Sequence, residues 1–152
     1  MQNVAKLSLY DLIQTYFEHN QEARAHIEEL KKKNRSREFQ DKQINTLLMH
    51  AIKEGNDEYM DAFIVHGATL KGNLQVDLPG AQLTLDGLAY LSSLTQLHVL
   101  ILSGSNIKDA DLPYLKNLHD LFLLNIKNTE VTEDGIQTHL KELSNVKIII
   151  TS

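Results

Sequence analysis

The strongest constraint on how this chain can fold is a recurrence of apolar residues every 24 positions in its second half. Of its 25 leucines, 18 lie after residue 73. Seven positions of the first unit recur in the second: Leu78, Gly80, Leu83, Leu88, Leu91, Leu94 and Leu97, then Leu102, Gly104, Ile107, Leu112, Leu115, Leu118 and Leu121. A third unit follows, in which Leu140, Leu143 and Val146 are displaced by 25. A fixed period of this length is typical of stacked supersecondary units.

Each unit combines two kinds of spacing. The first part alternates with a period of two, which predicts a strand, and the second part has apolar residues three and four apart, which predicts a helix. Leu100 and Leu102 should therefore face inward from a strand. Residues that often cap helices stand at matching places before the helical parts: Thr84, Asp109 and Thr132.

One such unit cannot bury its apolar face alone, so we expect the units to stack into a parallel sheet backed by helices, an α/β arrangement. The stack should place residues 76–78, 100–102 and 124–126 side by side as adjacent parallel strands.

The segment LNIKNTEVTEDGI, from Leu124 to Ile136, is similar to the L-x-L-x-x-T-x-V-T-D-x-G-L form of bacterial leucine-rich repeats. Residues 74–152 resemble that family over several copies. The resemblance implies a short solenoid of about three units plus a terminal strand. The family's Asn or Cys at the end of each strand is replaced by Ala81, Ser105 and Thr129, and Ala81 cannot make the usual hydrogen bond. An ordinary α/β domain with coincidental leucine spacing is the alternative.

Residues 1–73 are predicted to be helical. Ser8 should begin an amphipathic helix, and a second helix should run from about Gln21 to Lys33. The polar stretch from Asn34 to Lys42 is predicted to be a loop.

Residues 46–68 resemble a single ankyrin repeat. The positions that match the family's T-P-L-H-x-A-x-x-x-G and G-A pattern are Thr46, Leu48, Ala51, Gly55, Gly67 and Ala68. Gly55 and Gly67 should each lie just past a helix end with positive φ. Because one ankyrin unit cannot form a stable array, we interpret residues 1–73 as a helical, ankyrin-like cap on the leucine-rich repeats of residues 74–152. A generic helical hairpin is the alternative.

The sequence contains little that predicts catalysis. It has no Cys, which excludes thiolate nucleophiles and Cys-ligated zinc, and it lacks phosphate-binding, nucleophile-elbow and HExxH motifs. His50 and Glu54 are close in sequence and could share a metal with His66, whereas the dipeptide His119–Asp120 has no motif spacing. The remaining carboxylates are expected to stabilise helix starts: Asp109, Asp111, Glu133 and Asp134. We therefore expect no enzyme activity, cofactor or metal, with a small enzyme using a His/carboxylate site as the alternative.

The charge pattern argues against a nucleic-acid reader. The net charge is −5, and the one basic run, from Lys31 to Arg37, holds five basic residues in seven. Weak nucleic-acid binding through that run is a second alternative. No apolar stretch is long enough for a membrane span or a secretory signal, so we expect a soluble, cytoplasmic protein.

The outer face of the predicted sheet is the candidate binding surface. Alternation places Val99, Leu123 and Ile148 in one row and Ile101, Asn125 and Ile150 in the next, with Asp77, Asn125 and Lys127 at the rim. An apolar patch with a polar rim is typical of a protein interface. The sequence therefore predicts a non-catalytic protein–protein interaction module. The alternative is that the N-terminal helices fold over this face and bury it.

The terminal segment, Val146 to Ile150, is predicted to be an apolar edge strand blunted only by Lys147. Such an edge could pair with a protein partner or with a second copy of the chain as a homodimer. The bacterial type of the repeats implies an effector delivered into a host cytoplasm or a toxin-neutralising protein.

Overall fold

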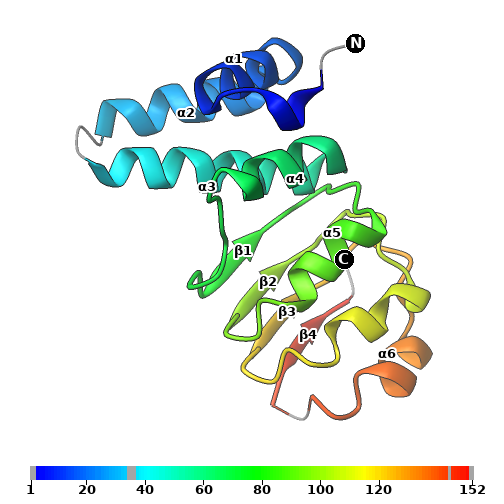
Figure 1. The fold of residues 1–152 in the computed structure, drawn as a ribbon. Helices are drawn as coiled ribbons and strands as arrows, with labels where there is room; N and C mark the ends of the chain where they lie inside the picture. The colour runs from blue at the N-terminus through cyan, green and yellow to red at the C-terminus, as the bar shows by residue number, and fades with distance from the viewer. Residues whose placement is uncertain (1–2, 34–36, 144, 151–152) are drawn as a thin grey trace. The chain divides into compact units, whose positions relative to one another are not determined.

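The computed structural model of the chain describes residues 3–33, 37–143 and 145–150. The protein is mixed α/β and contains a four-stranded parallel sheet. It divides into two compact units, Met1–Ala51 with Asn56–Leu70, and Ile52–Gly55 with Lys71–Ser152 (Figure 1).

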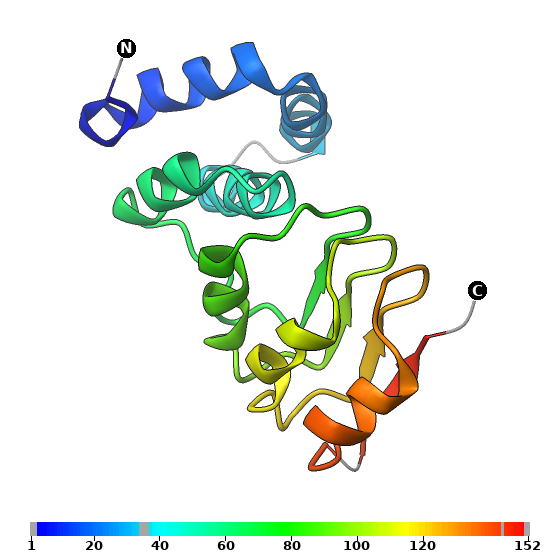
Figure 2. The same ribbon diagram turned by 90° about the vertical axis from the view of Figure 1, so that its right-hand side faces the viewer.

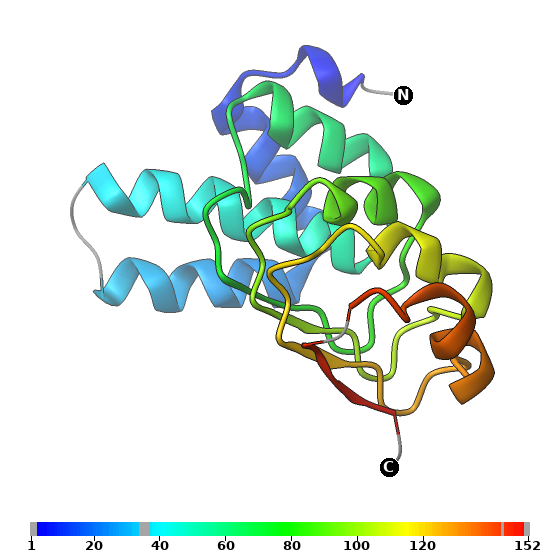
Figure 3. The same cartoon turned by 90° about the horizontal axis from the view of Figure 1, so that it is seen from below.

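The first unit is helical. Its elements are η1 (Val4–Lys6), α1 (Leu9–His19), α2 (Gln21–Lys33), α3 (Arg37–Lys53) and α4 (Asp57–Val65), with the last two residues of α3 counted in the second unit. Helix α1 begins where predicted, because the Ser8 hydroxyl accepts a hydrogen bond from the Asp11 amide at 3.2 Å. Helices α2 and α3 run side by side in opposite directions, as Figures 1 and 3 show.

Aromatic packing holds this unit together. The fully buried ring of Tyr16 lies 4.9 Å from Tyr59 and 5.2 Å from Phe63, measured between ring centroids. Offset and edge-on pairs of this kind stabilise by roughly 0.5–1.5 kcal/mol beyond the area they bury.

Two expectations for residues 1–73 are tested by the structure. The predicted loop from Asn34 to Lys42 is wrong over residues 37–42, which open helix α3, while residues 34–36 lie outside the described residues. The stretch has no apolar stripe, so its sequence pattern does not predict a helix. Its Gln, Glu and Lys residues nevertheless have high intrinsic helix propensity. The positive φ predicted for Gly55 and Gly67 is confirmed, at 73° and 97°.

The second unit alternates strands and helices. Its elements are β1 (Gln75–Asp77), α5 (Leu85–Ser92), β2 (Val99–Ile101), η2 (Asp109–Leu115), β3 (Leu123–Asn125), α6 (Glu133–His139) and β4 (Lys147–Ile149). The strands are parallel and follow chain order, β1-β2-β3-β4. Figure 2 shows α5, η2 and α6 together on one side of this sheet.

The predicted register is confirmed for the first three strands. Val76 pairs with Leu100, and Leu100 pairs with Leu124, which is the constant displacement that the leucine repeat predicts. Leu100 and Leu124 are fully buried, and Val76 is 1% exposed. The same bond also recurs just past each strand: the amide of Leu78 donates to the carbonyl of Ile101, that of Leu102 to Asn125 and that of Ile126 to Ile149, each at 2.8 Å.

The fourth strand has a different register from the one predicted. Lys147 lies opposite Leu123, and Ile148 lies opposite Leu124, so the displacement is the same as between the earlier strands. The turns before the strands keep the longer displacement expected of the third unit, because the amides of Leu97, Leu121 and Val146 donate to Leu94, Leu118 and Leu143. Strands β2 and β3 begin two positions after that turn, whereas β4 begins directly after Val146. A single residue is therefore missing between turn and strand, and this restores the regular step.

The helix starts follow the sequence at two of three places. Thr84 and Thr132 cap α5 and α6, their hydroxyls accepting from the amides of Gly87 and Gly135 at 3.0 Å. Asp109 is not a cap: it is the first residue of η2, and its carboxylate binds Thr132 instead.

The Asn106 side chain stabilises the turn that follows β1. In the second and third leucine repeats, a side-chain hydroxyl accepts a hydrogen bond from the backbone amide two residues later. Ser105 accepts from Ile107 at 3.5 Å, and Thr129 accepts from Val131 at 3.3 Å. Ala81 has no such group. The Asn106 side chain of the next unit replaces it, accepting from the Leu83 amide at 2.8 Å and donating to the Leu83 carbonyl at 3.0 Å. The first leucine repeat therefore keeps its turn through a hydrogen bond from the second repeat.

Candidate functional site

The candidate site is the face of the sheet opposite its helices, which we call the sheet face. It is formed by the outward residues of the four strands, in two rows: Gln75, Val99, Leu123 and Lys147, then Asp77, Ile101, Asn125 and Ile149. The intervening residues Leu100 and Leu124 fill the core. Val99, Ile101 and Leu123 are half-buried, in contrast to these neighbours.

Two of the predicted site residues do not belong to this face. Ile148 pairs with the inward Leu124, so it points to the helix side of the sheet. Ile148 and Ile150 line a cavity of about 430 Å³ together with Glu133, Asp134, Ile136 and Gln137 of α6. Their places on the sheet face are taken by Lys147 and Ile149, because the fourth strand starts one position early.

The polar residues of the sheet face are anchored within the strands. The Asn125 side chain accepts a hydrogen bond from the Lys127 amide at 3.1 Å. The Gln75 amide group donates to the Asp77 carboxylate at 2.9 Å. Asp77 lies on β1, at one edge of the sheet face. Lys127, which follows β3, and Lys147, on β4, lie toward the opposite edge.

A further row at the start of the strands was missed by the sequence reasoning. Leu74, His98 and Phe122 follow one another at the repeat period and precede β1, β2 and β3. The His98 and Phe122 rings are 5.5 Å apart, and Leu74 and Phe122 are 54% and 53% exposed. The three positions follow the 24-residue period, but a leucine, a histidine and a phenylalanine share no residue type that would mark them as equivalent in the sequence.

The histidines considered as metal ligands, His50 and His66, make hydrogen bonds within residues 1–73 of the chain. His50 Nε2 lies 3.0 Å from Nδ1 of His26, so one ring nitrogen donates and the other accepts. His66 donates to the backbone carbonyl of Leu7 at 3.1 Å. Within residues 3–33, 37–143 and 145–150 no group of three or more His, Cys, Asp and Glu side chains is placed to hold a metal ion. The dipeptide His119–Asp120 is exposed.

The acidic residues at the helix starts make structural contacts. The two oxygens of Asp109 accept hydrogen bonds from the Thr132 amide at 2.8 Å and the Thr132 hydroxyl at 2.6 Å. These bonds lower the pKa of Asp109 below its ordinary value. The carboxylate approaches Gly135 so closely that a Cβ there would overlap it. Asp111 accepts from the Lys108 amide at 3.1 Å. Glu133 and Asp134 lie in the first turn of α6.

The basic run is described only in part. Lys31, Lys32 and Lys33 occupy the last turn of α2, where positive charge interacts favourably with the helix dipole. Lys32 pairs with Glu29 at 3.1 Å, and both side chains are well exposed. Residues 34–36 and the side chain of Arg37 lie outside the described residues.

No family model, curated protein or solved structure matches the chain. Among the described residues, no helix combines the length and apolarity needed to cross a membrane. Fold and geometry therefore define a mixed α/β protein whose parallel sheet is covered by helices on one side and has an apolar, charge-rimmed sheet face on the other.

Proposed function

We propose that this chain is a non-catalytic protein–protein interaction module that binds a protein partner through the sheet face. The observation that carries the proposal is the row of half-buried apolar side chains, Val99, Ile101 and Leu123, on adjacent strands. Contiguous apolar surface with a polar rim is a feature of binding sites, and parallel sheets are normally covered on both faces.

The proposal includes a finer description of the second unit, as a short leucine-rich repeat stack. It is supported by the constant strand register and by the hydrogen bond that recurs past each strand. The positive φ of Gly80 and Gly104, at 72° and 68°, repeats at the same step. The role of residues 1–73 as an ankyrin-like cap rests on the sequence alone.

An interaction role fits the site better than catalysis. Burying the exposed parts of three apolar side chains would contribute roughly 25 cal/mol per Å² removed from water. The polar groups of the face, by contrast, are engaged along their own strands: Asn125 with Lys127, and Gln75 with Asp77. Asp77 and Lys147, the ionisable residues in the two rows of the sheet face, lie on its two outermost strands, so they do not form a pair of nucleophile and general base.

The test compares partner capture by variants that differ only on the face. A triple variant, V99T/I101T/L123T, keeps strand-compatible residues but makes the face polar. The matched control is Leu85→Thr, at a residue of α5 that is 66% exposed on the helix side. Circular dichroism should show all three proteins folded.

A protein that is retained by the wild type and by Leu85→Thr, and lost by the triple variant, is the expected result. Equal retention by all three folded proteins would contradict the proposal, because the sheet face would then contribute nothing to binding.

A further inference from the structure

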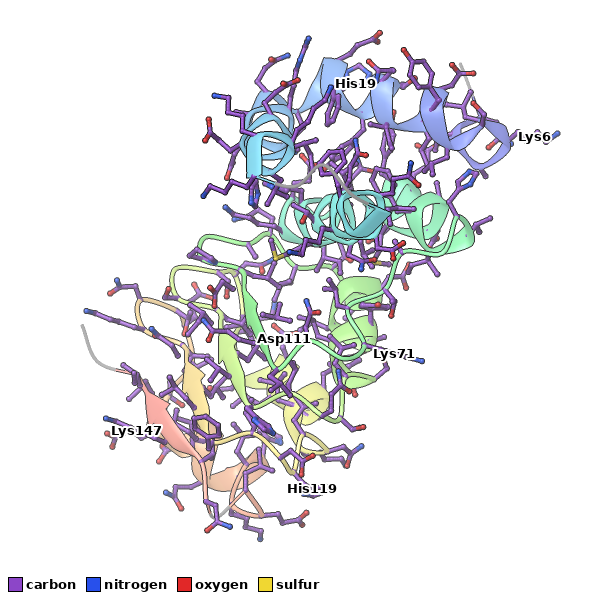
Figure 4. The ribbon with its side chains drawn as sticks, turned by 90° about the vertical axis from the view of Figure 1, so that its left-hand side faces the viewer. Lys6, His19, Lys71, Asp111, His119 and Lys147 are labelled. Carbon is purple, nitrogen blue, oxygen red and sulfur yellow. The ribbon has the colours of Figure 1, made fainter. Side chains whose placement is uncertain are left out.

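The sheet face is electrically asymmetric from one edge of the sheet to the other. Asp77 stands on β1, whereas Lys127 follows β3 and Lys147 stands on β4. Asp77 and Lys147 are exposed, and Lys127 is half-buried. Figure 4 labels Lys147 on the edge strand. One end of the face is therefore anionic and the other cationic.

Between these ends the face is apolar. Val99 and Ile101 lie on β2, Leu123 lies on β3, and Ile149 continues the surface on β4. A surface with an apolar centre and opposite charges at its two ends is complementary to itself after a two-fold rotation.

We infer that the partner on this face is a second copy of the same chain, packed sheet to sheet about a two-fold axis that runs parallel to the strands between β2 and β3. The inference rests on the proposed function and names its partner. The rotation places β1 over the partner's β4 and β2 over the partner's β3. Val99 then faces the partner's Leu123. Asp77 lies over the partner's Ile149, with the partner's Lys127 and the partner's Lys147 diagonal to it.

One polar group, Asn125, lies in the centre of this packing. Asn125 would face the partner's Ile101, an apolar side chain. Its side-chain oxygen keeps the hydrogen bond from the Lys127 amide, but Ile101 offers no acceptor to its side-chain N–H groups, so this pair weakens the contact.

The size of the face sets the strength of the contact. Four strands spaced about 4.8 Å apart span about 19 Å, and about five residues along a strand span about 16 Å. The resulting footprint of roughly 300 Å² is well below the roughly 800 Å² per partner of a standard stable interface. We therefore expect reversible self-association that depends on concentration, not a permanent dimer.

The experiment is sedimentation equilibrium on the full chain, from about 10 μM to about 1 mM, at low and at high salt. Asp77→Lys alone and Lys147→Asp alone should each weaken self-association by about tenfold, because each places like charges together twice in the symmetric contact. The combined variant D77K/K147D restores opposite charges between positions 77 and 147 and should recover part of the lost association, because the lysine introduced at position 77 still lies beside the partner's Lys127. Lys141→Asp, at an exposed residue that follows α6 and lies outside the strands, is the charge control and should leave the dissociation constant unchanged.

Two results would overturn the inference. A wild type that stays monomeric to about 1 mM excludes the second copy, and it leaves a different protein partner on the same face open to the capture experiment above. A dimer whose dissociation constant in both single variants equals that of the wild type lies on another surface, such as the β4 edge. Self-association that both single variants weaken, with no other protein captured by the wild type, would support the second copy as the partner on the sheet face.

Discussion

The bond from Asn106 to Leu83 provides a sharp test of how the second unit is held together. Asn106→Ala removes both hydrogen bonds to the Leu83 backbone, which lies at a residue only 7% exposed. A buried group that loses its partner costs roughly 1–3 kcal/mol, so we expect the free energy of unfolding to fall by about 1–3 kcal/mol.

The measurement combines urea unfolding with hydrogen exchange at the Leu83 amide, which should lose protection in Asn106→Ala. The matched control is Asn117→Ala, at an exposed asparagine in the same unit, which should change stability by no more than about 0.5 kcal/mol. The double variant A81S/N106A restores a local hydroxyl like that of Ser105, so it should recover part of the loss.

The reasoning would be refuted if Asn106→Ala and Asn117→Ala had the same stability and Leu83 exchanged at the same rate in both. That result would mean that the turn after β1 does not depend on the hydrogen bonds between the Asn106 side chain and the Leu83 backbone.

Three further predictions follow from single contacts. Leu100→Ala, at a fully buried residue, should lower the free energy of unfolding by about 2–5 kcal/mol in urea titration. Gly55→Ala should destabilise more than Gly80→Ala in thermal unfolding: both residues have positive φ, but only at Gly55 does an added Cβ overlap a backbone atom, the Gln82 carbonyl oxygen. Hydrogen bonds from Thr132 lower the folded-state pKa of Asp109, so its contribution is present above the unfolded pKa of about 3.9 and is lost as pH falls through the folded value. Below about pH 4 the stability of the wild type should therefore fall more steeply than that of Asp109→Asn, and equal slopes would contradict this.

The sequence was sufficient to predict the strand register where spacing is regular. Buried leucines such as Leu100 and Leu124 recur at one step, and only a stack of parallel strands places them together. The positive φ of Gly55 and Gly67 was also predictable from the sequence, because glycine is the residue that most easily adopts positive φ at a helix end.

The remaining features depend on contacts that spacing does not encode. Lys147 replaced Ile148 on the sheet face because a single residue is missing before β4, and apolar residues on both sides of that strand hide the shift. Asp109 was expected to cap its own helix, but Thr132, in the next unit, offers its carboxylate an amide and a hydroxyl donor. Such bonds across units need the fold before they can be recognised.

Solvent relaxation of methyl groups tests the central claim most directly, because the sheet face can bind a partner only if it is open to water. With a soluble paramagnetic gadolinium chelate, we expect strong relaxation of the Val99, Ile101 and Leu123 methyls and weak relaxation of the Leu100 and Leu124 methyls. Equal protection of all these side chains in the dilute protein would contradict the account, since the face would then be covered by the chain itself.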